Sequence, residues 1–171
     1  MQVHSVEAIV RALNDAGVQY LIVGGLAVNA HGYERFTNDV DLVIGLEPAN
    51  IIRGLRALEA AGYQPAVPIT PEQFADAGLR DSWRTGKNML VLKLWSDAHR
   101  QTPVDVFVYE PFHFASEYAR ARWEPLRDDL RAPIVSYAAL LAMKRDAGRP
   151  QDLADIADLE RLQQLKKEFN K

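Results

Sequence analysis

Apolar residues recur first at helical spacing and then in short continuous runs. Their three- and four-residue intervals over 6–13 predict a first helix that ends near Gly17. The segment 19–23, apolar from Tyr20 onward, predicts a buried strand, which leads through a glycine turn into a short helix over 26–30. The chain therefore opens with a helix, a strand and a second helix.

A polar loop over 32–38 precedes a second predicted strand over 39–44. The apolar positions over 51–58 then have helical spacing, with Asn50 as the expected N-cap and Gly62 as the expected stop. Prolines interrupt the segment that follows, so only a short helix beginning at a proline is expected there. This part of the chain adds one strand and one helix to the predicted fold.

Two further strands are predicted over 89–95 and 104–108, joined by a polar loop as an antiparallel hairpin. Helical patterns dominate from residue 117 onward, with Ser136 as an expected cap. The pattern predicts an α+β fold in which a mixed, twisted sheet is flanked by helices. We expect a core over 1–115 and a helical extension over 116–171 packed on it.

Composition and charge exclude some classes of function. Hydrophobic residues make up 48% of the chain and charged residues 25%, as in ordinary globular proteins. The net charge of −3 argues against coating nucleic acid by bulk charge. The chain has no cysteine, so a metal would be bound by oxygen or imidazole ligands.

The segment 1–7 has neither the basic start nor the apolar centre of a signal peptide. The longest apolar stretch, 20–28, contains two glycines and is too short to span a bilayer. We therefore expect a cytoplasmic protein that does not contact membranes.

The candidate chemistry begins at Gly24-Gly25, between a strand and a helix. Glycine lets the backbone approach a bulky anion, and amides at a helix start attract phosphate. Strand-to-helix turns also need glycine for geometry alone, and taken by itself this motif favours that simpler interpretation.

Three aspartates carry the stronger signal. Asp39 and Asp41 are two positions apart on a predicted strand, so their side chains point to the same face. Asp105 lies in the middle of an apolar strand, where a charge needs a partner. That partner is either a basic side chain or a divalent cation shared with the other two carboxylates. Two cations about 3.5–4 Å apart at such a cluster promote in-line displacement at phosphorus.

The stretch from residue 20 to residue 44 resembles the signature of the DNA polymerase β-like nucleotidyltransferase superfamily. Its elements are Gly-Gly-x-Ala, His-Gly and Arg-x-Thr-x-Asp-x-Asp-Leu. This combination is most similar to the AbiEii-type toxins of type IV toxin–antitoxin systems. Lincosamide and aminoglycoside nucleotidyltransferases contain a similar stretch. Asp105 and Lys144 extend the resemblance along the chain in the expected order.

The resemblance implies a role for each matched residue. Asp39 and Asp41 would bind two Mg²⁺ ions, or Mn²⁺ in their place, and Asp105 would bind one ion and act as, or place, the base. These three are the implied catalytic residues. The implied nucleotide-binding residues are Gly24, Gly25, Arg35, Thr37 and Lys144. For Lys144, an exposed helical lysine without a ligand is an equal alternative. Gln151 stands where the family has a lysine, which weakens that contact.

The implied activity is transfer of NMP from an NTP to an acceptor hydroxyl. In the toxin interpretation the acceptor is RNA, such as a tRNA 3′ end, or a protein, and an antitoxin is the expected partner. Basic residues near the hairpin could follow a phosphate backbone or form a solvated face: Arg80, Arg84, Lys87, Lys93 and Arg100.

Two alternatives to the toxin interpretation stay open. One is an antibiotic-type enzyme acting on a small molecule, whose pocket would need acidic residues to meet an aminoglycoside cation. The candidates for such residues are Glu110, Glu117 and Asp97. The other is an inactive fold that only binds a partner, which the presence of all three aspartates argues against.

Overall fold

The computed structural model describes residues 1–169 and contains one seven-stranded mixed sheet with the order β3-β4-β5-β2-β1-β7-β6. Its strands are β1 (Tyr20–Val23), β2 (Val40–Ile44), β3 (Gln64–Pro65), β4 (Val91–Trp95), β5 (Val104–Phe107), β6 (Arg122–Arg127) and β7 (Leu130–Ile134). Its helices are α1 (Val3–Asp15), α2 (Gly24–Ala30), α3 (Pro48–Ala60), α4 (Pro71–Ala75), α5 (Ala77–Lys87), α6 (Phe114–Ala119), α7 (Tyr137–Ala147) and α8 (Pro150–Phe169). The predicted α+β class is confirmed.

The centre of the sheet brings distant segments into register. Strands β1 and β2 are antiparallel and place Val23 beside Asp41. Strands β2 and β5 are parallel and place Asp41 beside Asp105. The expected hairpin of β4 and β5 is antiparallel and places Lys93 opposite Asp105. Three neighbouring strands thus carry polar side chains at one level of the sheet.

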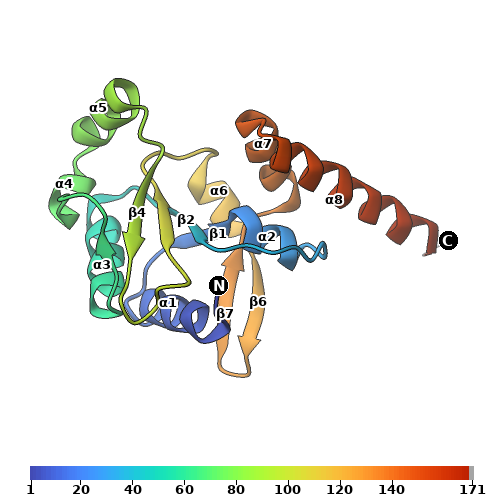
Figure 1. Cartoon of the computed structure of the whole chain (residues 1–171), viewed down its shortest axis with the longest axis horizontal. Coiled ribbons are helices and arrows are strands. Elements are labelled where there is room, and N and C mark those ends of the chain that lie inside the picture. Colours follow the sequence, from blue (N-terminus) through green and yellow to red (C-terminus); the bar gives the residue numbers. More distant parts are fainter. Residues whose placement is uncertain (170–171) are drawn as a thin grey trace.

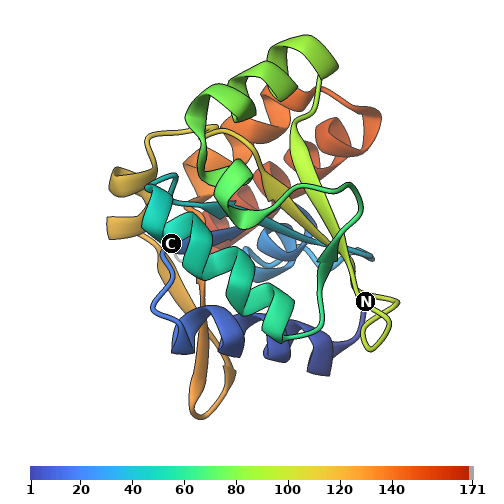
Figure 2. The same ribbon diagram turned by 90° about the vertical axis from the view of Figure 1, so that its left-hand side faces the viewer.

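Helices cover both faces of the sheet (Figures 1 and 2). Helices α1 and α3 lie together on one face, where Ile44 packs beneath Gly54 of α3. Helix α2 contacts β1 and β2 from the other face and packs against α7. Because side chains alternate along β2, Leu42 enters the buried core while Asp41 faces the side of α2.

Two expectations about local structure need correction. Helix α3 starts earlier than predicted, because the Glu47 side chain caps it by accepting from the Asn50 amide. Asn50 instead bonds to Gln19 and Gly45 through its side-chain amide. The segment after α4, for which no helix was expected, forms α5 with Asp76 as its N-cap.

Residues 122–134 also differ from the predicted helical pattern. They form the hairpin of β6 and β7, and β7 joins the main sheet in parallel to β1. Pro125 and Pro133 make these two strands hard to recognise in the sequence, because proline is unusual inside a strand. The division into a core over 1–115 and a helical extension over 116–171 stays a prediction.

Helix α7 begins at the cap that the sequence predicts. The Ser136 hydroxyl caps α7 by accepting from the Ala139 amide, and Gly148 ends it in a left-handed conformation. Helix α8 packs beside α7 and then extends away from the rest of the molecule (Figure 1). Among residues 1–169, no helix is both long and apolar enough to cross a membrane.

Candidate functional site

Asp39, Asp41 and Asp105 converge on the face of the sheet that α2 and α7 border. Each offers a carboxylate oxygen, and these oxygens lie within 4.8 Å of one another. The parallel register of β2 and β5 causes the meeting, because it sets Asp41 directly beside Asp105. We call these three residues the aspartate cluster.

Burial and the repulsion of neighbouring carboxylates both act on Asp41. Burial comes first, followed by the charges of Asp39 and Asp105, and together they raise the pKa of the Asp41 carboxyl to about 7. A hard divalent cation would relieve this repulsion, and carboxylate oxygens are the ligands that Mg²⁺ prefers. The donor set of the cluster therefore fits Mg²⁺ or Mn²⁺.

Lys93 belongs to the same site. Its ammonium Nζ lies 2.8 Å from Asp105 Oδ1, and this contact to Asp105 is the main cause that raises the pKa of Lys93. From the sequence, Lys93 was only one of several basic residues near a hairpin. The strand register that places it opposite Asp105 is the signal that a local pattern cannot supply.

Positions 24 and 25 have room only for glycine, because other side chains pack directly against them. A Cβ atom on Gly24 would lie 1.9 Å from Asp41 Oδ2, and one on Gly25 would lie 2.4 Å from Thr37 Oγ1. Gly24 also has a φ of +62°, which L side chains rarely adopt. The two glycines hold the aspartate cluster close to α2, and their contact with a triphosphate stays a prediction.

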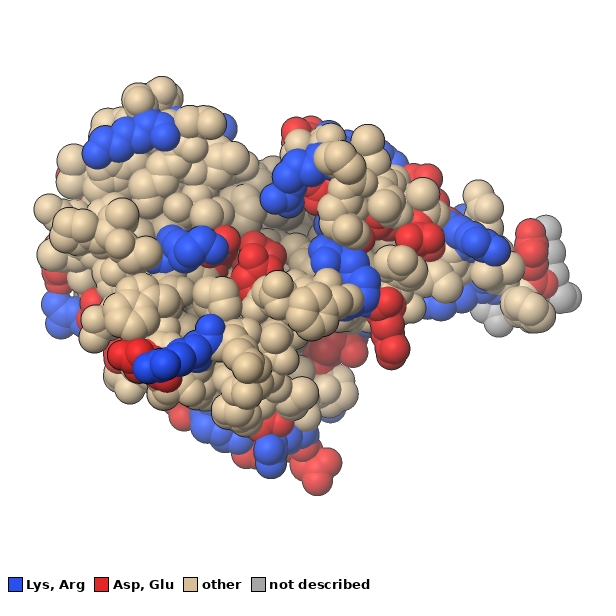
Figure 3. All heavy atoms as spheres, viewed as in Figure 1, with Lys and Arg blue, Asp and Glu red and all other residues tan. Residues whose placement is uncertain are grey.

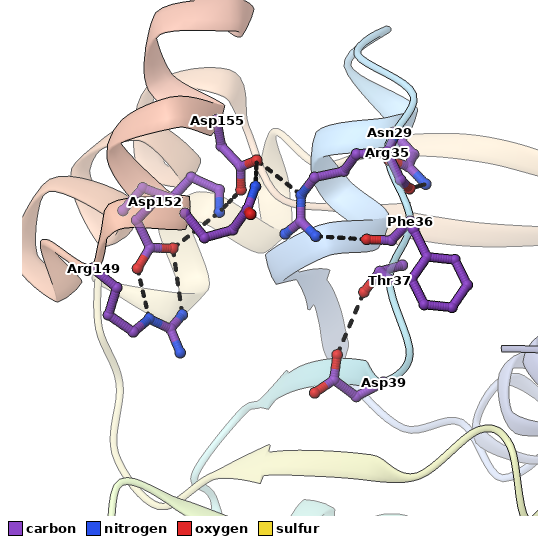
Figure 4. A network of polar contacts seen from close by, with 10 residues as sticks. Asn29, Arg35, Phe36, Thr37, Asp39, Arg149, Asp152 and Asp155 are labelled. Atoms are coloured by element: carbon purple, nitrogen blue, oxygen red, sulfur yellow. Dashed lines mark hydrogen bonds and ion pairs between the residues drawn. The ribbon is translucent and has the colours of Figure 1, made fainter.

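The loop before β2 links the cluster to the C-terminal helices (Figure 4). Thr37 Oγ1 donates to Asp39 Oδ1 at 3.4 Å. Arg35 Nε lies 2.8 Å from Asp155 Oδ1 of α8, and its Nη1 donates to the Phe36 carbonyl. Arg35 is thus already paired with a carboxylate, and its expected role toward phosphate stays a prediction.

Lys144 is buried rather than exposed. Its ammonium lies 3.2 Å from Asp152 Oδ1 and 2.6 Å from Asp155 Oδ2, at the junction of α7 and α8. Arg149 pairs with Asp152 at 2.7 Å. Asp152 is thus a partner of both cations. The predicted contact of Lys144 with a nucleotide stays a prediction.

A cleft of about 950 Å³ opens above the aspartate cluster, between α5 and α7. Acidic side chains lie at its bottom and basic side chains on both sides (Figure 3). The guanidinium of Arg84 stacks 4.1 Å from the ring centre of Tyr109 on one wall. The cleft has the size of a ligand-binding pocket. Residues that line it include Gly25, Asp41, Asp105, Phe107, Met143 and Arg149.

Four of the five basic residues near the hairpin have different surroundings. Arg80 is buried and donates to the Phe74 carbonyl. Arg100 pairs with Asp97 on the surface. Arg84 stacks on Tyr109 inside the cleft, and Lys93 contacts the aspartate cluster. The contacts of these four residues therefore differ, and a path for a phosphate backbone stays a prediction.

No family model matches the chain, and none of the curated proteins matches it. Among solved structures, the chain is similar to that of an antigenic nucleotidyltransferase-like protein from Paracoccidioides brasiliensis. The two chains share 17% sequence identity with a TM-score of 0.54, and the match covers 94% of this chain and 76% of the other. At this identity the likeness concerns the fold: the chain has a nucleotidyltransferase-like fold.

Proposed function

We propose that this protein is a metal-dependent nucleotidyltransferase that moves NMP from an NTP to an acceptor hydroxyl. The observation that carries the proposal is the convergence of Asp39, Asp41 and Asp105 within 4.8 Å at the bottom of a large cleft. The nucleotidyltransferase-like fold supports it independently. The residues fit a site for divalent cations with oxygen ligands.

In the proposed reaction, the acceptor oxygen forms a bond to the α-phosphorus and the bond to the β-phosphate oxygen breaks. Pyrophosphate leaves, and the acceptor proton passes to the Asp105 carboxylate or to water that it holds. Bound divalent cations would lower the pKa of the acceptor hydroxyl and neutralise the pyrophosphate. Asp39 and Asp41 would hold these cations, while Thr37 orients Asp39 through its hydroxyl.

The finer proposal is a toxin-like enzyme whose acceptor is RNA or a protein and whose activity an antitoxin restrains. It is supported by the run of motifs from Gly24 to Asp41, which resembles AbiEii-type toxins. An aminoglycoside-type pocket would need acidic residues around the acceptor. Of the three candidates Glu110, Glu117 and Asp97, Glu110 lines the cleft, together with Asp146, while Glu117 and Asp97 do not.

Incubation with each α-³²P-labelled NTP, Mg²⁺ and total cellular RNA or protein tests the proposal. We expect label to appear in a macromolecule with the wild-type protein. Label should be absent with EDTA and with Asp41→Asn, which keeps the shape of the side chain and removes its charge. Undiminished transfer by Asp41→Asn would contradict the proposal.

A further inference from the structure

Lys93 stands out because it contacts the aspartate cluster from an exposed position. It lies on β4 directly opposite Asp105, and its side chain is 53% exposed while that of Asp105 is 13% exposed. Register neighbours in a sheet point to the same face, so the ammonium reaches the cluster from the solvent side. The 2.8 Å separation between Lys93 Nζ and Asp105 Oδ1 is that of a direct ion pair.

The other cations around the cleft are engaged elsewhere. Arg35 pairs with Asp155, Arg149 pairs with Asp152, and Lys144 lies between those two carboxylates. Among residues 1–169, Lys93 is the basic side chain that forms an ion pair with the aspartate cluster, and it does so with Asp105 alone. The aspartate cluster therefore has one positive charge in direct contact with it, beside Asp105 of β5.

This ion pair competes with a metal ion at Asp105. A Mg²⁺ ion bound to the same oxygen at about 2.1 Å would lie within roughly 5 Å of the ammonium, where like charges repel strongly. Asp39 and Asp41, by contrast, have no lysine or arginine partner among the described residues. Asp39 and Asp41 are therefore expected to bind a divalent cation more readily than Asp105 does.

We propose that Lys93 is an internal counter-ion that occupies the place of the second divalent cation until the nucleotide binds. This inference rests on the proposed function. In the free protein Asp39 and Asp41 bind one ion, while Lys93 keeps Asp105 neutralised. The triphosphate supplies new negative charge in the cleft, to which the flexible Lys93 side chain moves, and Asp105 then becomes available as a metal ligand. The nucleotide thus assembles the complete site.

Mn²⁺ binding measured by electron paramagnetic resonance tests this without any turnover. The wild-type protein should bind one Mn²⁺ alone and two in the presence of a non-hydrolysable NTP analogue. Lys93→Met keeps most of the apolar stem and removes the charge, so it should bind two ions without nucleotide, the second about tenfold more tightly than wild type. Lys87→Ala, which removes an exposed lysine at the end of α5, is the matched control and should behave as wild type.

The outcomes separate this inference from the proposed function. Two ions in the nucleotide-free wild-type protein, or one ion in both wild type and Lys93→Met, overturns the role of Lys93 and leaves the enzyme proposal standing. The absence of Mn²⁺ binding from every variant, with and without nucleotide, overturns both. If Lys93→Met does not fold, Lys93→Gln, which keeps a polar side chain and removes the charge, replaces it; one ion in nucleotide-free Lys93→Gln overturns the role of Lys93.

Discussion

Gly24 and Asp41 are so close that a Cβ atom on Gly24 would lie 1.9 Å from Asp41 Oδ2. Strand β1 ends at Val23, which is the register partner of Asp41 in β2, so the chain turns into α2 directly beside the carboxylate. The glycine and the aspartate are therefore one structural unit. Any side chain at position 24 displaces a proposed metal ligand.

Gly24→Ala should weaken both the fold and metal binding. Gly17 is the control, because it has a similar φ of +64° but no atom within 4 Å of its would-be Cβ. Both changes carry the backbone cost of a left-handed alanine, and Gly24→Ala adds an overpacking cost of about 1–3 kcal/mol. Thermal unfolding and Mn²⁺ titration of the two variants measure the difference. Equal stability and equal Mn²⁺ affinity would contradict the close packing.

Asp41→Asn should stabilise the metal-free protein near neutral pH. The folded-state pKa of Asp41, about 7, lies above its ordinary value of 3.8. The stability that this raised pKa contributes is thus fully present below about pH 4 and is lost as the pH rises through 7. Asparagine removes this pH-dependent loss.

In EDTA at pH 8, we expect Asp41→Asn to be more stable by about 2 kcal/mol, or roughly 4–8 °C in Tm. At pH 4 the difference should largely vanish. Thermal unfolding across this pH range measures the effect. A lower Tm for Asp41→Asn at pH 8 would show that the carboxylate is not under repulsion.

Lys144→Ala should destabilise the junction of α7 and α8. The change leaves Asp152 and Asp155 buried with one cation fewer, and breaking a buried pair in this way costs about 3–5 kcal/mol. Arg145→Ala on the same helix removes an exposed pair with Glu160 and should cost less than about 1 kcal/mol. Urea unfolding of both variants gives the comparison. Similar losses would mean that Lys144 contributes no more than a surface charge.

Asp105→Asn should separate nucleotide binding from transfer. Asparagine keeps the shape of the side chain but has no negative charge and does not accept the acceptor proton. We expect transfer to fall by at least about 100-fold, the lower end of a general-base contribution, while NTP affinity changes less. Calorimetric titration with a non-hydrolysable NTP analogue, alongside the labelled transfer assay, measures both. Loss of binding and transfer in equal measure would assign Asp105 to nucleotide binding instead.

Local patterns predicted the central elements of the fold because the strands and helices there have clear periodicity. The two-residue spacing of Asp39 and Asp41 was also enough to predict that both carboxylates point to one face of the sheet. The hairpin β6–β7 was not predicted, since Pro125 and Pro133 interrupt strands that nevertheless join the sheet. Helix α5 was missed because it carries few apolar residues for a core-facing stripe.

Partners across the chain could not be read from local spacing. The pairing of Lys93 with Asp105 depends on strand register, and that of Lys144 with Asp152 and Asp155 depends on how α8 packs against α7. A charged residue in an apolar segment signals only that a partner exists. For Asp105 the sequence left a basic side chain and a cation as alternatives, and the structure shows a basic side chain beside a cluster that fits a cation.

The most direct test of the central claim is an anomalous difference map from crystals grown with Mn²⁺ and a non-hydrolysable NTP analogue. We predict Mn²⁺ peaks in contact with the carboxylates of Asp39, Asp41 and Asp105, bridging to the triphosphate. A bound analogue with no peak at these three side chains would contradict the account.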